Sequence, residues 1–121
     1  MKRSNPESGI QTAIVQFLRA ALPAGYRAMS IPNGGKRDAV TGAILKREGA
    51  MAGAPDLQVI GPQGAVAFIE VKAPNGSLSP AQKDFKDWCG EWSVPFCVAR
   101  GIGDVEAFLR DQNVPLRGRA A

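Results

Sequence analysis

Three charged side chains lie in an otherwise apolar stretch, residues 53–76. Asp56 precedes one apolar run, and Glu70 and Lys72 lie two residues apart in the next. Alternate residues of a strand share a face, so Glu70 and Lys72 would lie side by side. Two neighbouring carboxylates repel unless a cation lies between them, and Mg²⁺ accepts one or two carboxylates together with phosphate oxygens. With a lysine beside that ion to orient water or stabilise phosphoryl charge, the pattern suggests a site that cleaves phosphodiester bonds.

This site requires one particular hairpin register. A two-residue loop at Pro62-Gln63 would place residue 56 opposite 69, so that Asp56 would point away from Glu70. One more loop residue, or a bulge at a glycine, would place 56 opposite 70. We predict the second register. The alternative is an exposed Glu70–Lys72 ion pair, with Asp56 capping a turn.

The composition limits the chemistry further. The chain has no histidine, which excludes Ser-His-Asp and Cys-His catalysis and histidine-ligated zinc. Its two cysteines, Cys89 and Cys97, have no metal-site spacing and are interpreted as buried thiols. No G-x-x-x-x-G-K-[ST] pattern is present, so no nucleotide cofactor is expected. The chemistry must rely on carboxylates, lysine and a hard metal ion.

The length indicates one domain, and the charge permits an anionic partner. We expect residues 1–121 to form a single domain, with a core of about 7–110 and a loose basic tail at 113–121. The formal charge of +4 permits binding to nucleic acid. No apolar run approaches the roughly 18 residues of a membrane span, and the N-terminus lacks the apolar centre of a signal peptide. We therefore expect no membrane association and a cytoplasmic location, in a bacterial cell or a phage-infected host.

The elements that must position these residues follow from periodicity and capping residues. Asn5 can cap the first helix, and Ser79 with Gln82 can form a capping box on a later one. Trp88 and Trp92 lie on the apolar stripe of that later helix, and we place them in the core rather than at an interface. The segment 39–55 is expected to be a short helical turn and a mobile loop. The predicted order is helix 5–22, strand 26–31, segment 39–55, strands 56–61 and 65–73, helix 78–92, strand 95–100 and helix 103–112. This is an α/β fold with a mixed sheet of about four strands flanked by helices.

Several motifs together resemble a known nuclease family. "PD" at 55–56, thirteen intervening residues and "EVK" at 70–72 match the PD-(D/E)XK motif. Further segments resemble the stand-alone VRR-NUC domains of phages and bacteria: "NGGKR" at 33–37, "GAMAGAPDL" at 49–57 and "FIEVKAPNGSLSPAQ" at 68–82. The resemblance runs from about residue 7 to 110 and implies a restriction-endonuclease-like core.

The resemblance also implies roles for single residues. Asp56 and Glu70 would bind Mg²⁺ or Mn²⁺, the Val71 carbonyl would add a ligand, and Lys72 would be the catalytic lysine. Gln82 would support the site from its helix, with helix capping as an alternative role that is compatible with the first. Glu7 would complete the metal shell directly or through water, with stabilisation of the helix dipole as the alternative.

The resulting hypothesis is a metal-dependent, structure-selective DNA endonuclease that uses in-line attack by a metal-activated water. Holliday junctions or other branched DNA would be the substrate, and two paired cuts would require a homodimer. The alternatives are a monomeric flap or end-directed nuclease and a non-catalytic nucleic-acid binding module. We expect contacts with the DNA backbone from paired basic residues: Lys36, Arg37, Lys46, Arg47, Lys83 and Lys86. The alternatives are that the segment containing the first four is a plain connecting loop and that the basic residues form an ordinary solvated surface.

Overall fold

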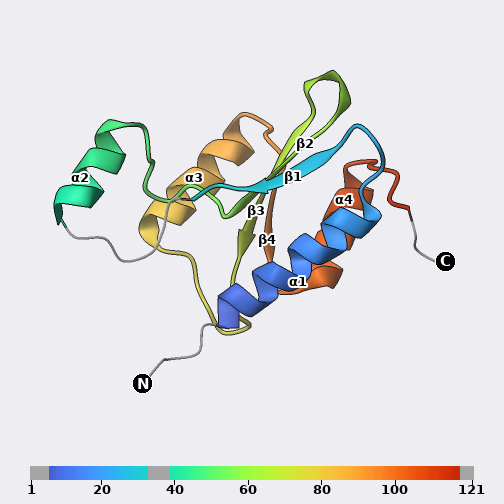
Figure 1. Cartoon of the computed structure of the whole chain (residues 1–121), viewed down its shortest axis with the longest axis horizontal. Coiled ribbons are helices and arrows are strands. Elements are labelled where there is room, and N and C mark those ends of the chain that lie inside the picture. Colours follow the sequence, from blue (N-terminus) through green and yellow to red (C-terminus); the bar gives the residue numbers. More distant parts are fainter. Residues whose placement is uncertain (1–5, 33–38, 118–121) are drawn as a thin grey trace.

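The strands form one four-stranded mixed sheet, as the sequence predicts. The computed structural model describes residues 6–32 and 39–117 of the chain. The strands lie in the order β1, β2, β3, β4; the first three are antiparallel, and β4 runs parallel to β3. In sequence order the elements are α1 (Pro6–Ala21), β1 (Arg27–Ser30), α2 (Ala39–Arg47), β2 (Leu57–Ile60), the short 3-10 helix η1 (Pro62–Gly64), β3 (Val66–Val71), α3 (Pro80–Glu91), β4 (Phe96–Ala99) and α4 (Ile102–Asp111) (Figure 1).

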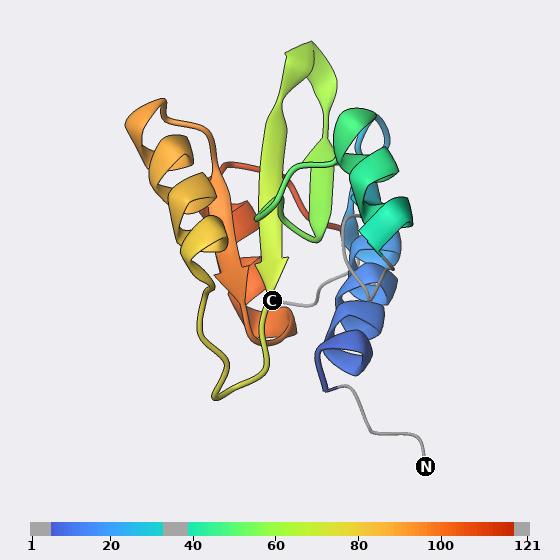
Figure 2. The ribbon, with the colours of Figure 1, turned by 90° about the vertical axis from the view of Figure 1, so that its left-hand side faces the viewer.

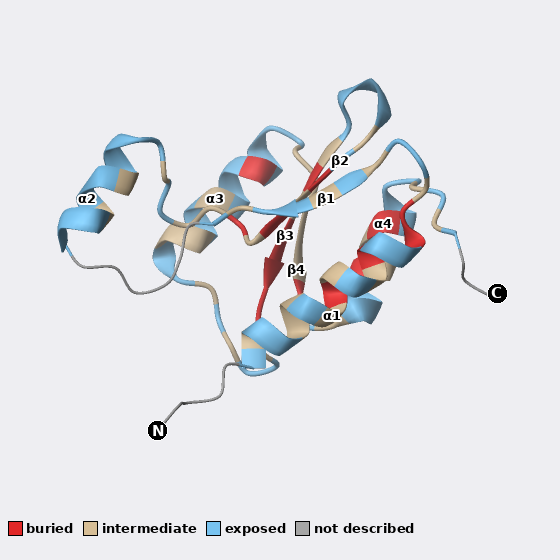
Figure 3. Cartoon of the chain, in the orientation of Figure 1, coloured by how far each residue is buried: buried red, intermediate tan, exposed pale blue. Residues whose placement is uncertain are grey.

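The main core lies between the sheet and two neighbouring helices, α1 and α4. Strand β3 points Ala67, Ile69 and Val71 into it, as the two-residue period of a strand requires. α1 contributes Ile14 and Leu18, which lie one turn apart and are fully buried. Figure 3 shows this burial along β3 and on the inner sides of α1 and α4. The core therefore fixes β3, the strand that carries Glu70, from one face.

Helix α3 covers part of the other face, beside β4 and away from α1 (Figure 2). The ring of Phe85 meets Phe68 of β3 edge to face, with centroids 5.5 Å apart. Cys89, one turn further on, is buried as the sequence predicts, whereas Cys97 of β4 is only half-buried. The prediction that Trp88 and Trp92 are core residues is wrong, because they remain 48% and 66% exposed. The side of the helix that carries Gln82, Phe85 and Cys89 faces the sheet, and both tryptophans flank it.

The segment after β1 contains a longer helix than the short turn that the sequence predicts. α2 has nine residues, none of them buried. Gly42 lies within α2 without ending it, whereas Gly49 follows the helix and ends it. Gly49 has φ +112°, and the N–H of Ala50 donates to the Leu45 carbonyl, a common way to end a helix. No helix within 6–32 and 39–117 has the length and apolar character needed to cross a membrane.

The segment after α4 is docked up to residue 117, which corrects the expectation of a loose tail. Val114 and Leu116 pack against the core. The backbone N–H of Arg117 donates to the Ala21 carbonyl at the end of α1, at 2.8 Å. The alternating apolar residues therefore outweigh the basic composition of this segment. Positions 118–121 lie outside the described residues, as does the expected cap Asn5.

Candidate active site

The hairpin between β2 and β3 has the register that the sequence predicts for convergent carboxylates. Leu57 pairs with Ile69, so that residue 56 lies opposite residue 70. The N–H of Gly61 donates to the Ala65 carbonyl and closes a loop of three residues, 62–64. This is one residue more than the two-residue loop that would have separated the carboxylates. Asp56 Oδ2 accepts a hydrogen bond from the Val71 N–H at 2.8 Å, which holds the Asp56 carboxylate beside β3.

Glu70 is a buried carboxylate with an incomplete set of partners. Only 2% of the residue is exposed, and no described residue donates a hydrogen bond to its Oε1 atom. Burial, and then the nearby Asp56 carboxylate, raises the pKa of Glu70 from its ordinary 4.5 to about 8, while Lys72 acts in the opposite direction. A buried oxygen without a partner, next to a second carboxylate, is a place where a cation would be favourable.

Gln82 makes the contacts expected for both roles that the sequence left open. Its Oε1 accepts from the Ser79 N–H at 2.9 Å, and Ser79 Oγ accepts from the Gln82 N–H at 3.2 Å, which completes the capping box. The same side chain donates from Nε2 to Glu70 Oε2 at 3.2 Å. The first turn of α3 therefore fixes one oxygen of Glu70 and leaves the other available.

The loop that precedes Asp56 is held against that same helical turn. Gly53 has φ +84°, and a Cβ atom there would collide with the carbonyl group of Ala81. Only glycine combines this backbone conformation with so close an approach. The contact explains why a glycine-rich approach precedes Asp56, since it brings the loop against the helix that carries Gln82.

Glu7 lies at the edge of this group. It is in the first turn of α1, and its Oε2 lies 3.5 Å from the N–H of Ala73, a long hydrogen bond. Its charge contributes to the raised pKa of Glu70, although less than that of Asp56. Within the described part of the chain, no three acidic or cysteine side chains lie close enough to hold a metal ion by themselves. A cation held by Asp56 and Glu70 would therefore complete its shell with backbone, water or substrate oxygens, as Mg²⁺ commonly does.

Val71 is the last residue of β3, and Lys72 follows it. Lys72 is buried directly after β3, and its N–H donates to the Ala99 carbonyl at 3.0 Å. Its ammonium group lies close enough to Glu70 to lower the pKa of that carboxyl. The side chain of Val71 is in the apolar core, so only its backbone could serve the site.

An open cleft of about 770 Å³ gives access to the carboxylates. Glu7, Asp56, Glu70 and Gln82 line it together with residues of α1 and β1. The predicted DNA contacts do not line this cleft: Lys46 and Arg47 are exposed in the last turn of α2, and Lys83 and Lys86 are exposed on α3. Lys36 and Arg37 lie outside the described residues.

Sequence reasoning missed Arg100, which follows β4. Its Nη1 donates to the carbonyls of Ala73 and Gly76, both at 2.7 Å, and lies 3.4 Å from that of Pro74. The guanidinium therefore holds the loop that connects β3 to α3, directly after Lys72. A basic residue at the end of a strand was visible in the sequence, but its relation to Lys72 depends on the parallel pairing of β3 and β4.

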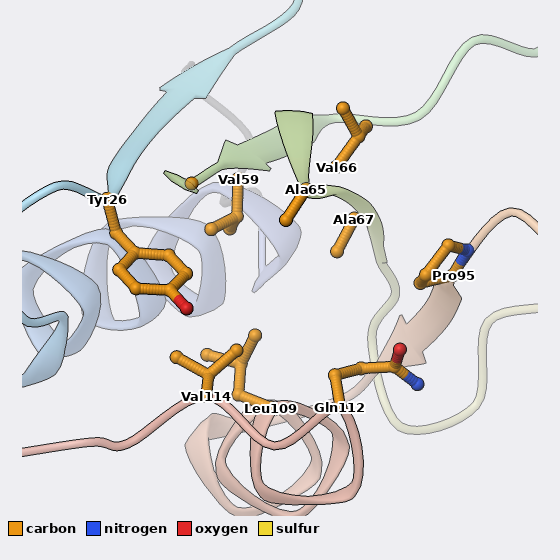
Figure 4. A pocket seen from close by; sticks show the side chains of 10 residues that line it. Tyr26, Val59, Ala65, Val66, Ala67, Pro95, Leu109, Gln112 and Val114 are labelled. Carbon is orange, nitrogen blue, oxygen red and sulfur yellow. The ribbon is translucent and has the colours of Figure 1, made fainter. Parts of the chain in front are cut away.

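A second hollow, of about 260 Å³, lies at the opposite end of β3 (Figure 4). Tyr26, Val59, Leu109 and Val114 line it among other uncharged residues. With no carboxylate, lysine or arginine on its walls, it offers none of the groups that phosphodiester chemistry requires. The chemical groups are therefore concentrated in the larger cleft.

Two solved structures and one family model match most of this chain. A solved structure described as a "VRR_NUC domain protein" has a TM-score of 0.69 and 26% sequence identity over 91% of this chain and 89% of its own. Another, described as a "VRR_NUC domain", has a TM-score of 0.58 and 22% identity over 88% of this chain and 97% of its own. No curated protein sequence matches the chain. The family model of the VRR-NUC domain matches residues 6–102. The chain therefore belongs to the VRR-NUC domain family, and its nuclease-type fold is that of the PD-(D/E)XK superfamily.

Proposed function

We propose that the protein is a metal-dependent endonuclease that hydrolyses phosphodiester bonds in branched DNA, with Holliday junctions as the preferred substrate. The observation that carries the proposal is the pair of carboxylates at the end of the open cleft. One of them, Glu70, has a buried oxygen without a hydrogen-bond partner among the described residues. These residues fit a hard divalent cation, Mg²⁺ or Mn²⁺, because such ions prefer carboxylate oxygens and tolerate water and phosphate in the remaining positions.

Asp56 and Glu70 would hold the cation, with the Val71 carbonyl as a further oxygen ligand and Glu7 acting through water. When bound, the cation would neutralise charge on the phosphodiester and lower the pKa of an attacking water. Asp56 is already oriented by the Val71 N–H, and Glu70 by the Gln82 amide. Little rearrangement of these side chains would therefore be needed on binding.

Lys72 would orient the attacking water or stabilise the negative charge that develops on the phosphoryl oxygens. Its burial supports this role, since a positive charge acts more strongly where solvent is excluded. The new bond forms between the water oxygen and phosphorus while the bond to the leaving sugar oxygen breaks. The attacking water would release a proton to solvent and the leaving oxygen would take one up from solvent, so that the products are a phosphate monoester and a free hydroxyl group.

Paired cuts in a junction require two active sites, so we propose a homodimer as the working form. The exposed Trp88 supports this, because it lines a hollow of about 380 Å³ together with Met51 and Phe85. Asp84, Asp87 and Glu91 surround the same hollow. The carboxylates would repel DNA, whereas a second copy of the chain would cover the apolar centre and leave the carboxylates at the solvated rim of the interface.

Cleavage of labelled DNA tests this function. The protein is incubated with Mg²⁺ or Mn²⁺ and a four-way junction, a flap or a linear duplex, alongside Asp56→Asn and Lys72→Ala. We expect metal-dependent cleavage of the junction, reduced by at least about 100-fold in both variants, the scale of losses when a charge-stabilising group is removed. Asp111→Asn, which removes an exposed carboxylate at the end of α4, is the matched control and should cleave like wild type.

Each other outcome has a defined meaning. Cleavage that survives both site variants would show that a contaminating nuclease, or a different site of this chain, performs the chemistry. Preference for a flap or a free end over the junction would favour the monomeric nuclease, and binding without any cleavage would favour a nucleic-acid binding module.

A further inference from the structure

Three arginines from distant parts of the chain line one hollow on the surface. Arg19 is in the last turn of α1, Arg27 begins β1, and Arg117 follows α4. The hollow has a volume of about 460 Å³, and all three arginines are exposed. The remaining lining residues carry no carboxylate, and no described residue forms an ion pair with any of the three arginines. The hollow therefore has a concentrated positive charge that nothing in the described chain neutralises.

Tertiary contacts, rather than sequence proximity, bring this charge together. The hydrogen bond from the Arg117 N–H to the Ala21 carbonyl draws the last described residue to the end of α1. Strand β1 is the edge of the sheet, since within residues 6–32 and 39–117 it pairs with β2 alone. Arg27 therefore lies at the edge of the sheet, where a large partner can approach.

The arginine-lined hollow is continuous with the candidate active-site cleft. Arg19, Ala28 and Met29 line both. One path thus runs from Asp56 and Glu70, between α1 and β1, to the three arginines. Along it the charge changes from negative, where a cation would bind, to positive. A ligand that follows it must place an anionic group at each end, which is a property of a nucleic-acid backbone.

We propose that Arg19, Arg27 and Arg117 bind backbone phosphates of the nucleic-acid strand on one side of the bond that is cleaved. The inference rests on the proposed function and adds the surface that the substrate occupies. Guanidinium groups suit phosphates because they donate two parallel hydrogen bonds. Because the three are exposed around an open hollow, they fit an extended strand better than a small enclosed anion. Contacts of this kind position the substrate without reading its sequence.

The test is the salt dependence of DNA binding without divalent metal, so that no cleavage occurs. Fluorescence anisotropy measures the association constant for a four-way junction and a duplex over a range of salt concentrations. The variants are Arg19→Gln, Arg27→Gln, Arg117→Gln and the triple variant. On duplex, each lost phosphate contact should reduce the slope of log K against log salt by about 1, and the triple variant by about 3.

Two further variants separate a specific contact from net charge. Arg110→Gln removes the same charge from α4, where Arg110 is paired with Glu106 at 3.0 Å, and should leave the slope unchanged. Arg27→Lys keeps the charge and should keep the slope. Thermal unfolding checks that the variants, which change only exposed side chains, remain folded. An unchanged slope in the triple variant, or an equal loss with Arg110→Gln, would overturn the proposal, as would absence of DNA binding by wild type.

This experiment also separates the inference from the nuclease proposal. A wild-type protein that binds with the arginine-dependent slope but never cleaves with metal would contradict the nuclease and leave this surface standing. A protein that cleaves junctions while the triple variant binds and cleaves normally would keep the nuclease and remove this surface. Competition by inorganic phosphate that depends on the three arginines, without their effect on the DNA slope, would assign the hollow to a small anion and contradict the proposal.

Discussion

Glu70 is the residue whose surroundings conflict most with its charge. It is almost fully buried, one oxygen has no hydrogen-bond partner among the described residues, and a second carboxylate lies beside it. Such an arrangement is unfavourable for folding without a cation, because the charged form has lost its hydration. A site of this kind exchanges stability of the metal-free protein for affinity toward a positive ion.

Glu70→Gln should therefore make the metal-free protein more stable. In the folded protein, Glu70 keeps its proton up to a pKa of about 8, whereas the unfolded chain loses it near 4.5. The folded state thus binds more protons between these values, and wild type should lose stability as pH rises through this window. At pH 8 without metal, the variant should gain on the order of 2 kcal/mol, measured by chemical denaturation.

Added Mg²⁺ should make wild type more stable than Glu70→Gln. The ion should bind the folded wild-type protein and so stabilise it, whereas the variant lacks the Glu70 carboxylate and should gain much less. Asp111→Asn, at an exposed acid of α4, is the control and should behave like wild type in both conditions. Equal stabilisation of wild type and Glu70→Gln by Mg²⁺ would show that the ion binds elsewhere.

Among the secondary-structure elements, the loop from β3 to α3 does most to set the relative positions of the site residues on either side of it. It joins Lys72 to Gln82, and Arg100 at the end of β4 holds its carbonyls while the Arg100 N–H donates to Asp104 Oδ2 at 2.8 Å. The loop is therefore fixed from the neighbouring strand and from the start of α4. Its rigidity is a tertiary property that the loop sequence alone does not provide.

Arg100→Ala should loosen this loop. Loss of hydrogen bonds from an exposed guanidinium should cost about 1 kcal/mol of stability, while the Gly76 amide, which donates to the Ala73 carbonyl, should exchange faster with solvent. Cleavage should fall with little change in DNA affinity, because Lys72 and Gln82 lose their alignment rather than their charge. Arg110→Ala, which breaks the ion pair with Glu106 on α4, should leave cleavage unchanged. Unchanged amide exchange in Arg100→Ala would contradict the role of Arg100 in holding the loop.

At the scale of the whole molecule, the two faces of the sheet differ. α1 and α4 cover one face with the main core, while α3 covers part of the other and leaves Trp88 and Met51 exposed. The acidic rim around these side chains and the arginines at the far edge of β1 give the molecule surfaces of opposite character. We assign the first to a second copy of the chain and the second to nucleic acid.

Trp88→Glu should disrupt the homodimer, because it adds a charge to an apolar surface that already has an acidic rim. Light scattering should then report the mass of a monomer for the variant and of a dimer for wild type. Ile102→Glu changes a similarly exposed apolar residue at the start of α4 and should remain dimeric. A monomeric wild type would contradict the dimer and favour the monomeric nuclease.

The local elements were largely predictable because their signals are local. The alternation of Ala67, Ile69 and Val71 predicts a strand, and Ser79 with Gln82 predicts the start of α3. The predictions that were wrong depended on tertiary packing rather than on local signals. The exposure of Trp88 and Trp92 and the docking of residues 113–117 depend on how far α3 and α1 extend over their neighbours, which periodicity within one helix does not contain.

The sequence by itself determined the residue types available for chemistry: two carboxylates and a lysine at fixed spacing, without histidine. It also limited the hairpin to two registers. Only the tertiary structure decided between these registers. It also buries Glu70 with one oxygen that has no hydrogen-bond partner among the described residues, and it places Arg19, Arg27 and Arg117 around one hollow. The physical reason is that hydrogen bonding and periodicity act over a few residues, whereas burial and the field of a charge depend on which distant segments pack together.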